Sequence, residues 1–228
     1  MDKKKPIADI RLFFSDIANV VGNSLPSMLV DRQLAVETTR IVMKLREAAF
    51  SLGEFDHLYI NYTTCTVPGD IAPAERVDKV YRFYRYYDVH VPMKMPEILK
   101  EPDGRKKAVD LLRQTLLRYF APDQKTVSLI KESIDCALTE ESQMQMLYKE
   151  KHGTQYHALL FLRYTDEAKY RPVLYVTDCD GALVKKQDLP EMTELSLLGE
   201  IQVSRKKVTI KPGKCFYNKG IDPIVIEL

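Results

Sequence analysis

The residues best suited to chemistry stand together at positions 178–181, in the order Asp178, Cys179, Asp180 and Gly181. An apolar, strand-like run ends at Val176 just before them. An aspartate placed there can attack phosphorus as a nucleophile, while a second aspartate acts as acid and base and Mg²⁺ offsets the charge. A magnesium-dependent phosphatase that uses Asp178 and Asp180 is therefore one hypothesis.

The stretch from Val176 to Leu183 resembles the aspartate-nucleophile loop of haloacid dehalogenase-like phosphatases. That resemblance implies a parallel sheet whose later strands carry a lysine and a further acidic pair. The residues after Gly181 instead read as strands joined without helices. We therefore interpret Asp178–Gly181 as a hairpin turn, since Asp-Gly is a favoured pair in such turns, and keep the phosphatase as the alternative.

No other pattern indicates a catalytic, metal or cofactor site. The aspartate turn lacks the third acidic position and the terminal glutamate of a calcium loop, and the glycine-rich phosphate-binding motifs do not occur. The histidines are scattered without metal-ligand spacing, at His57, His90, His152 and His157. The sequence thus predicts no catalytic residue, no metal ligand and no cofactor.

Composition is that of an ordinary globular chain. The 228 residues are 45% hydrophobic and 29% charged, and a formal net charge of +2 gives no overall field to attract nucleic acid or an anionic membrane. Charged residues interrupt the stretch Ile7–Val21, so it has no signal-peptide core, and no window approaches the ~20 apolar residues of a spanning helix. Free thiols in a reducing compartment are expected for the widely spaced Cys65, Cys136, Cys179 and Cys215. We expect a cytoplasmic protein with no membrane partner.

The first two thirds of the chain favour helices. Apolar residues recur at helical spacing over Ile7–Val21, from Asp31 to Gly53, from Asp103 to Pro122, and from Asp123 to about Lys151. The last of these could break at Thr139–Ser142. Alternation predicts a strand over Phe55–Thr66, and Tyr81–Val91 is ambiguous between a strand and the end of a helix.

From Tyr156 onward the apolar residues recur with a period of two. Central strands are expected over His157–Tyr164 and Val173–Val176, and a turn or bulge is expected near Arg205 and Lys206, where the buried parity changes. We therefore predict an α+β fold in which a helical N-terminal half packs on a mainly antiparallel C-terminal β-sheet. Residues 1–228 are predicted to form a single domain, with a possible subdivision near residue 153.

Two stretches have the composition of recognition surfaces. The segment 81–87 interleaves aromatic residues with arginines, the types that dominate protein interfaces, and the same mixture can bind single-stranded nucleic acid or form a half-buried strand. The second stretch, the basic run Arg205–Lys219, contains no acid. It can contact an acidic partner or phosphates, or be a solvated edge strand. Predicted partner-binding residues are Tyr81, Arg82, Tyr84, Arg85, Tyr86, Tyr87, Arg205, Lys206 and Lys207.

Two segments, Phe55–Cys65 and Val203–Lys214 leading to Asn218-Lys219-Gly220, resemble α+β immunity proteins that bacteria encode beside polymorphic toxins. The resemblance implies a cytoplasmic, non-enzymatic protein that neutralises a cognate toxin by direct protein–protein binding. It carries over no specific residues. Many immunity proteins against nucleases are acidic, whereas this chain is near neutral, so the class of toxin is left open. The alternatives are the phosphatase and an RNA-binding module that uses the basic hairpin and the aromatic segment; nucleic acid ranks behind a protein partner.

Overall fold

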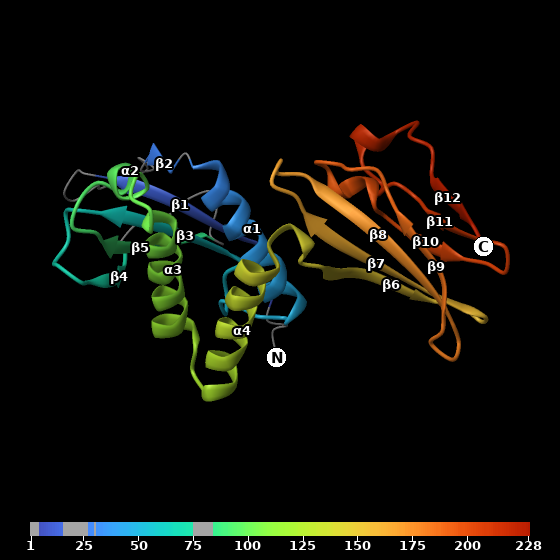
Figure 1. Cartoon of the computed structure of the whole chain (residues 1–228), viewed down its shortest axis with the longest axis horizontal. Coiled ribbons are helices and arrows are strands. Elements are labelled where there is room, and N and C mark those ends of the chain that lie inside the picture. Colours follow the sequence, from blue (N-terminus) through green and yellow to red (C-terminus); the bar gives the residue numbers. More distant parts are fainter. Residues whose placement is uncertain (1–4, 16–26, 30, 75–83) are drawn as a thin grey trace. The chain divides into compact units, whose positions relative to one another are not determined.

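The computed structural model describes residues 5–15, 27–29, 31–74 and 84–228 (Figure 1). The chain divides into two compact units, Met1–Glu141 (unit 1) and Ser142–Leu228 (unit 2). Both helices and sheets are present, as the α+β prediction requires. That the whole chain folds as a single domain stays a prediction. No helix within the described ranges has the length and apolarity needed to cross a membrane.

Unit 1 is built on a sheet with a parallel centre. Its strands lie in the order β2 (Ser27–Met28), β1 (Asp9–Ser15), β3 (His57–Thr63), β5 (Tyr84–His90) and β4 (Ile71–Pro73). β1, β3 and β5 run parallel, and the short outer strands β2 and β4 pair antiparallel. The carboxyl ends of three strands therefore meet at one edge of the sheet.

Helices of unit 1 begin and end at recognisable signals. They are α1 (Arg32–Glu47), α2 (Met95–Ile98), α3 (Gly104–Phe120) and α4 (Gln124–Glu140). The Asp31 carboxylate accepts the Leu34 amide at 2.7 Å, and the Asp123 carboxylate accepts the Thr126 amide at 2.8 Å, so α1 and α4 have side-chain N-caps. α4 stops where Glu141 adopts a positive φ of 49°, so the helix predicted to reach Lys151 ends at the break allowed near Thr139–Ser142.

α3 packs on the sheet through two tyrosines. The Tyr62 hydroxyl donates to the Ala108 carbonyl oxygen at 2.8 Å, and the Tyr87 and Tyr119 ring centroids lie 4.7 Å apart. Because side chains alternate along a strand, Leu58 and Ile60 share this face with Tyr62, and all three are fully buried. The opposite face carries His57, Tyr59 and Asn61 of β3.

The helix predicted over Ile7–Val21 is wrong. The described part of that stretch is strand β1, Asp9–Ser15, which pairs along its length with β3. Ile10 and Leu12 alternate as in a strand, whereas Ile10 and Phe13 have helical spacing, and a short apolar run does not distinguish the two. The pairing with β3 favours the strand. Residues 16–21 of the prediction lie outside the described residues. The prediction of a helical N-terminal half is wrong for the same reason, because a five-stranded sheet forms the centre of unit 1 in the described part of the chain.

Unit 2 is entirely antiparallel in its pairing, as predicted for the C-terminal sheet. One sheet has the order β6 (Met146–His152), β7 (Tyr156–Tyr164), β8 (Tyr170–Asp178), β9 (Leu183–Asp188), and the other has the order β10 (Ile201–Val203), β11 (Lys207–Ile210), β12 (Ile224–Glu227). β10 lies against β6 and β7. The turn predicted near Arg205 is confirmed, since residues 204–206 join β10 to β11. The buried core of the unit includes Leu160, Leu174, Val176, Val208, Ile210 and Ile226.

Replacing Tyr62 by phenylalanine is expected to lower the free energy of unfolding of unit 1 by about 1 kcal/mol, since one buried hydrogen bond to α3 is lost and the ring remains. Burial also raises the pKa of Tyr62 well above its usual range, so the hydroxyl stays a donor. Urea denaturation followed by circular dichroism measures the change. Tyr217→Phe, at an exposed ring, is the control and should leave stability unchanged. An equal loss in both variants would contradict the role of the Tyr62 hydroxyl.

Candidate protein-binding surface

The aromatic segment predicted to bind a partner is largely internal. Tyr81 and Arg82 lie outside the described residues. Tyr84 and Arg85 are half-buried, whereas Tyr86 and Tyr87 are only 4% and 8% exposed. Tyr87 packs against Tyr119 and Phe120 of α3 on one face of the sheet, and Tyr86 packs with Phe13 and Tyr59 on the other face.

Tyr84, Arg85 and Tyr86 are engaged in contacts within unit 1. Tyr86 belongs to an aromatic cluster with Phe13 and Tyr59, and the Tyr84 ring centroid lies 4.7 Å from that of Tyr59. The Arg85 guanidinium stacks over the Phe55 ring at 3.6 Å. These contacts stabilise the sheet, and they leave little of the segment as a surface for a partner.

The basic run is exposed but is divided between two ends of a sheet. Arg205 and Lys206 occupy the β10–β11 turn and Lys207 begins β11. The Ser204 hydroxyl accepts the Lys207 amide at 3.1 Å and shapes this turn. The remaining lysines of the run follow the other end of β11, beyond Ile210. Arg205–Lys207 therefore do not share one patch with them.

The Asp178 turn is a hairpin between the antiparallel strands β8 and β9. One carboxylate oxygen of Asp178 accepts the amides of Asp180 at 3.0 Å and Ala182 at 2.8 Å. This arrangement is an Asx-type turn. The hairpin interpretation of Asp178–Gly181 is confirmed, and that carboxylate oxygen has a structural role in holding the turn.

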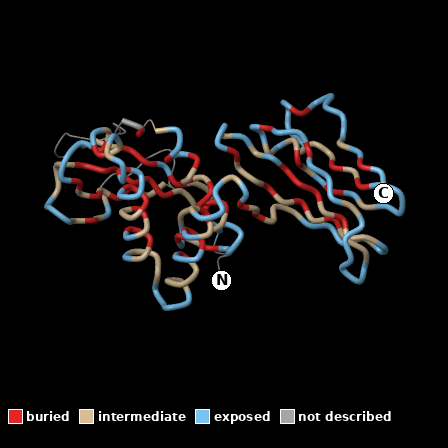
Figure 2. The backbone as a smooth tube through the Cα atoms, in the orientation of Figure 1, coloured by how far each residue is buried: buried red, intermediate tan, exposed pale blue. Residues whose placement is uncertain are grey.

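A different surface stands out in unit 2, on the connection between β11 and β12. We name residues 213–221 the aromatic tip. Phe216 and Tyr217 are 84% and 89% exposed, and their ring centroids lie 5.9 Å apart at an interplanar angle of 84°. Both belong to a short 3₁₀ turn, Phe216–Asn218. Residues 214–223 are exposed except at Asn218 (Figure 2).

Asn218 holds the aromatic tip in place. Its side chain is 8% exposed, and its amide nitrogen donates to the carbonyl oxygens of Ser196 at 2.9 Å and Gly213 at 3.0 Å. The Gly213 amide also donates to the Ser196 carbonyl oxygen at 2.7 Å. The two rings are therefore exposed on a turn whose third residue, Asn218, is hydrogen-bonded to the rest of unit 2.

Residues 211–213 form the base of the aromatic tip and are in close backbone contact with the loop before β10. The Gly199 amide donates to the Lys211 carbonyl oxygen at 2.8 Å, and an added Cβ at Gly199 would lie 2.5 Å from the Gly213 nitrogen. The Lys149 ammonium of β6 donates to the carbonyl oxygens of Leu198 at 2.6 Å and Gly199 at 2.7 Å. Partial burial lowers the pKa of Lys149. Both sheets of unit 2 thus support this base.

Charge within the aromatic tip is of one sign, and the exposed Asp222 directly follows it. Lys214 and Lys219 are exposed, and the sequence contains no acid from position 205 to 221. A shallow hollow of about 560 Å³ lies along the tip and is lined in part by Lys214, Phe216 and Ile221. The surface therefore combines aromatic area with positive charge.

Sequence reasoning passed over Phe216 and Tyr217, although a signal was present. Two adjacent aromatics stand between the turn formers Pro212-Gly213 and Asn218, and Gly220 follows. Neighbouring residues on a tight turn cannot both point into the same core, so at least one ring had to be exposed. Comparisons of this chain with protein-family models, with curated proteins and with solved structures found no match.

Proposed function

We propose that this chain is a non-enzymatic binding protein that docks on a protein partner through the aromatic tip. The observation that carries the proposal is the pair of rings at Phe216 and Tyr217, exposed on a turn that buried Asn218 anchors. The resemblance to immunity proteins points to the partner, a bacterial toxin domain that is neutralised by the complex.

The energetic argument rests on exposed aromatic area. Large aromatic side chains on a surface favour burial, at about 25 cal/mol per Å² of apolar area removed from water, and aromatic residues are enriched among the few side chains that dominate binding energy. A turn that is already ordered loses less conformational entropy when it binds. The aromatic tip meets both conditions, since its rings are exposed and Asn218 holds its turn in place.

The positive charge of the aromatic tip indicates what kind of partner surface is complementary to it. Lys214 and Lys219 flank the rings, and within the described residues neither has a carboxylate at ion-pair distance. An apolar pocket with an acidic rim would therefore accept Phe216 and Tyr217 while its carboxylates meet the lysines. We expect the toxin domain to present such a pocket.

The test uses the toxin domain that we expect to be encoded next to this chain, titrated calorimetrically with the wild type and with the double variant Phe216→Ala/Tyr217→Ala. Loss of both rings is expected to raise Kd at least about 100-fold, because paired hot-spot aromatics carry much of an interface. The unfolding midpoint should stay unchanged, since both rings are exposed.

The matched control is Arg205→Ala/Lys206→Ala, at the opposite end of β11, which should alter Kd by less than about threefold. If the wild type fails to bind the neighbouring toxin domain, the immunity role is wrong. If it binds and the ring variant binds equally well, the aromatic tip is not the interface.

A further inference from the structure

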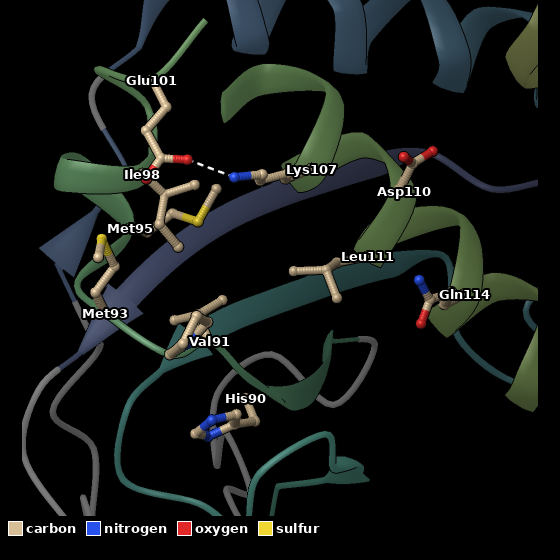
Figure 3. A pocket seen from close by; sticks show the side chains of 11 residues that line it. His90, Val91, Met93, Met95, Ile98, Glu101, Lys107, Asp110, Leu111 and Gln114 are labelled. Carbon is tan, nitrogen blue, oxygen red and sulfur yellow. Dashed lines mark hydrogen bonds and ion pairs between the residues drawn. The ribbon is translucent and has the colours of Figure 1, made fainter. Parts of the chain in front are cut away.

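A cavity of about 340 Å³ lies in unit 1 between α2 and α3, at the carboxyl end of the parallel strand β5 (Figure 3). Ligands of open parallel sheets bind at the carboxyl ends of the strands. Cavities that hold small molecules have volumes of about 300–1,000 Å³. The position and the size of this cavity are therefore those of a small-molecule site.

The walls of the cavity are apolar. Val91, which directly follows β5, lines it together with Met95 and Ile98 of α2, and all three side chains are buried. Leu111 of α3 faces them from the other side (Figure 3). Sites for small molecules are lined mainly by apolar side chains, with a few polar groups that orient the ligand. The inner part of this cavity therefore fits an apolar group.

Met93 extends the apolar surface from the cavity to the solvent. It lies between β5 and α2, lines the cavity and is 45% exposed (Figure 3). A methionine side chain is unbranched and flexible, so it adapts to apolar groups of different shapes. A ligand in the cavity would bury part of this exposed side chain and gain apolar contact area from it.

An ion pair supplies polar groups at the mouth of the cavity. The Lys107 ammonium donates a hydrogen bond to the Glu101 carboxylate, and both residues line the cavity (Figure 3). The Lys107 and Glu101 side chains are 55% and 39% exposed, so the pair is in contact with solvent. Asp110, on the next turn of α3, also lines the cavity. A ligand head group at the mouth therefore meets an ammonium and carboxylates together.

These charges favour a neutral head group. An anionic head would be repelled by Glu101 and Asp110, and a cationic head would be repelled by Lys107. A hydroxyl group both donates and accepts hydrogen bonds, so it can donate to the Glu101 carboxylate and accept from the Lys107 ammonium. A neutral head also avoids the free-energy cost of removing a charge from water.

We propose that the cavity between α2 and α3 binds a small neutral alcohol that carries an apolar group. The apolar group lies against Met95, Ile98 and Leu111. The hydroxyl group lies at the mouth, between Glu101 and Lys107. This site is in unit 1, and the inference goes beyond the protein binding proposed for the aromatic tip in unit 2.

The test titrates the full chain with 2-phenylethanol, and with phenethylamine and phenylacetate as probes of similar size that carry a positive and a negative charge. We expect 2-phenylethanol to bind with a Kd of about 10⁻⁴ M, within the range open to a ligand of this size. Each charged probe should bind at least about tenfold more weakly, since its head group faces a like charge. In NMR spectra, amide shifts should change within residues 91–101 and 107–114.

Leu111→Phe adds volume inside the cavity, so it should weaken 2-phenylethanol binding at least about tenfold. Leu117→Phe is the matched control and should bind as the wild type does, because Leu117 is also half-buried on α3 but lies six positions further along, on another side of the helix. A melting curve for each variant establishes that it is folded. If the folded Leu111→Phe variant binds as tightly as the wild type, or if the shifts lie elsewhere, the cavity is not the site.

Lys107→Met removes the ammonium from an exposed position and leaves the carboxylates of Glu101 and Asp110. Binding of phenethylamine should then become at least about tenfold tighter than in the wild type, since the repelling charge is gone. No binding of 2-phenylethanol to the wild type at millimolar concentration would overturn the proposal. So would a charged probe that binds the wild type as tightly as the alcohol, or an unchanged phenethylamine affinity in Lys107→Met.

Discussion

Replacing Gly199 by alanine is expected to destabilise unit 2 by about 3 kcal/mol and to abolish partner binding, although neither Phe216 nor Tyr217 is substituted. The new Cβ would lie 2.5 Å from the Gly213 nitrogen and 2.6 Å from the Lys211 carbonyl oxygen. Both are backbone atoms, which cannot rotate away as a flexible side chain can. Overpacking of this kind costs about 1–3 kcal/mol or more, and it would push the base of the aromatic tip away from the β10 loop.

Urea denaturation followed by circular dichroism measures the stability, and calorimetry with the toxin domain measures the binding. Gly220→Ala is the matched control within the same tip. Gly220 has a φ of +86° but no atom within 4 Å of an added Cβ, so alanine there costs only the backbone preference, about 1 kcal/mol. Similar losses in the two variants would contradict the close contact at Gly199.

Much of unit 2 follows from its sequence, whereas the centre of unit 1 does not. In unit 2 the buried residues alternate, as Leu160 and Leu162 do, and hairpin turns such as Asp178–Gly181 separate the runs. Local pattern and long-range pairing agree there. In unit 1 the strand Asp9–Ser15 pairs with β3, although α1 lies between the two strands in the sequence. A short apolar run cannot encode a pairing partner about 48 positions further along the chain.

The functional surfaces were harder to predict than the strands. Tyr86 and Tyr87 are residue types common in interfaces, yet the aromatic cluster on one face of the sheet and α3 on the other bury them. Phe216 and Tyr217 are exposed because Asn218 occupies the anchoring position of their turn. Composition alone does not separate these cases, since the same residue types stabilise a core and a binding surface.

The cavity of unit 1 depends on an equally close backbone contact, between α2 and the start of α3. An added Cβ at Gly104 would lie 2.1 Å from the Ile98 carbonyl oxygen and 2.7 Å from the Leu99 Cα. Gly104 is buried, and its amide donates to the Glu101 carbonyl oxygen at 3.0 Å. Only glycine allows the chain to turn from α2 into α3 at this distance.

Gly104→Ala is therefore expected to lower the free energy of unfolding of unit 1 by about 3 kcal/mol, measured by urea denaturation. Because α2 would move away from α3, the cavity between Ile98 and Leu111 would also widen. Gly53→Ala is the control, since Gly53 has a φ of +92° and open space around an added Cβ, and it should cost only about 1 kcal/mol. If Gly104→Ala is no more destabilising than Gly53→Ala, α2 and α3 do not approach as closely as this structure places them, and the two walls of the cavity have no fixed spacing.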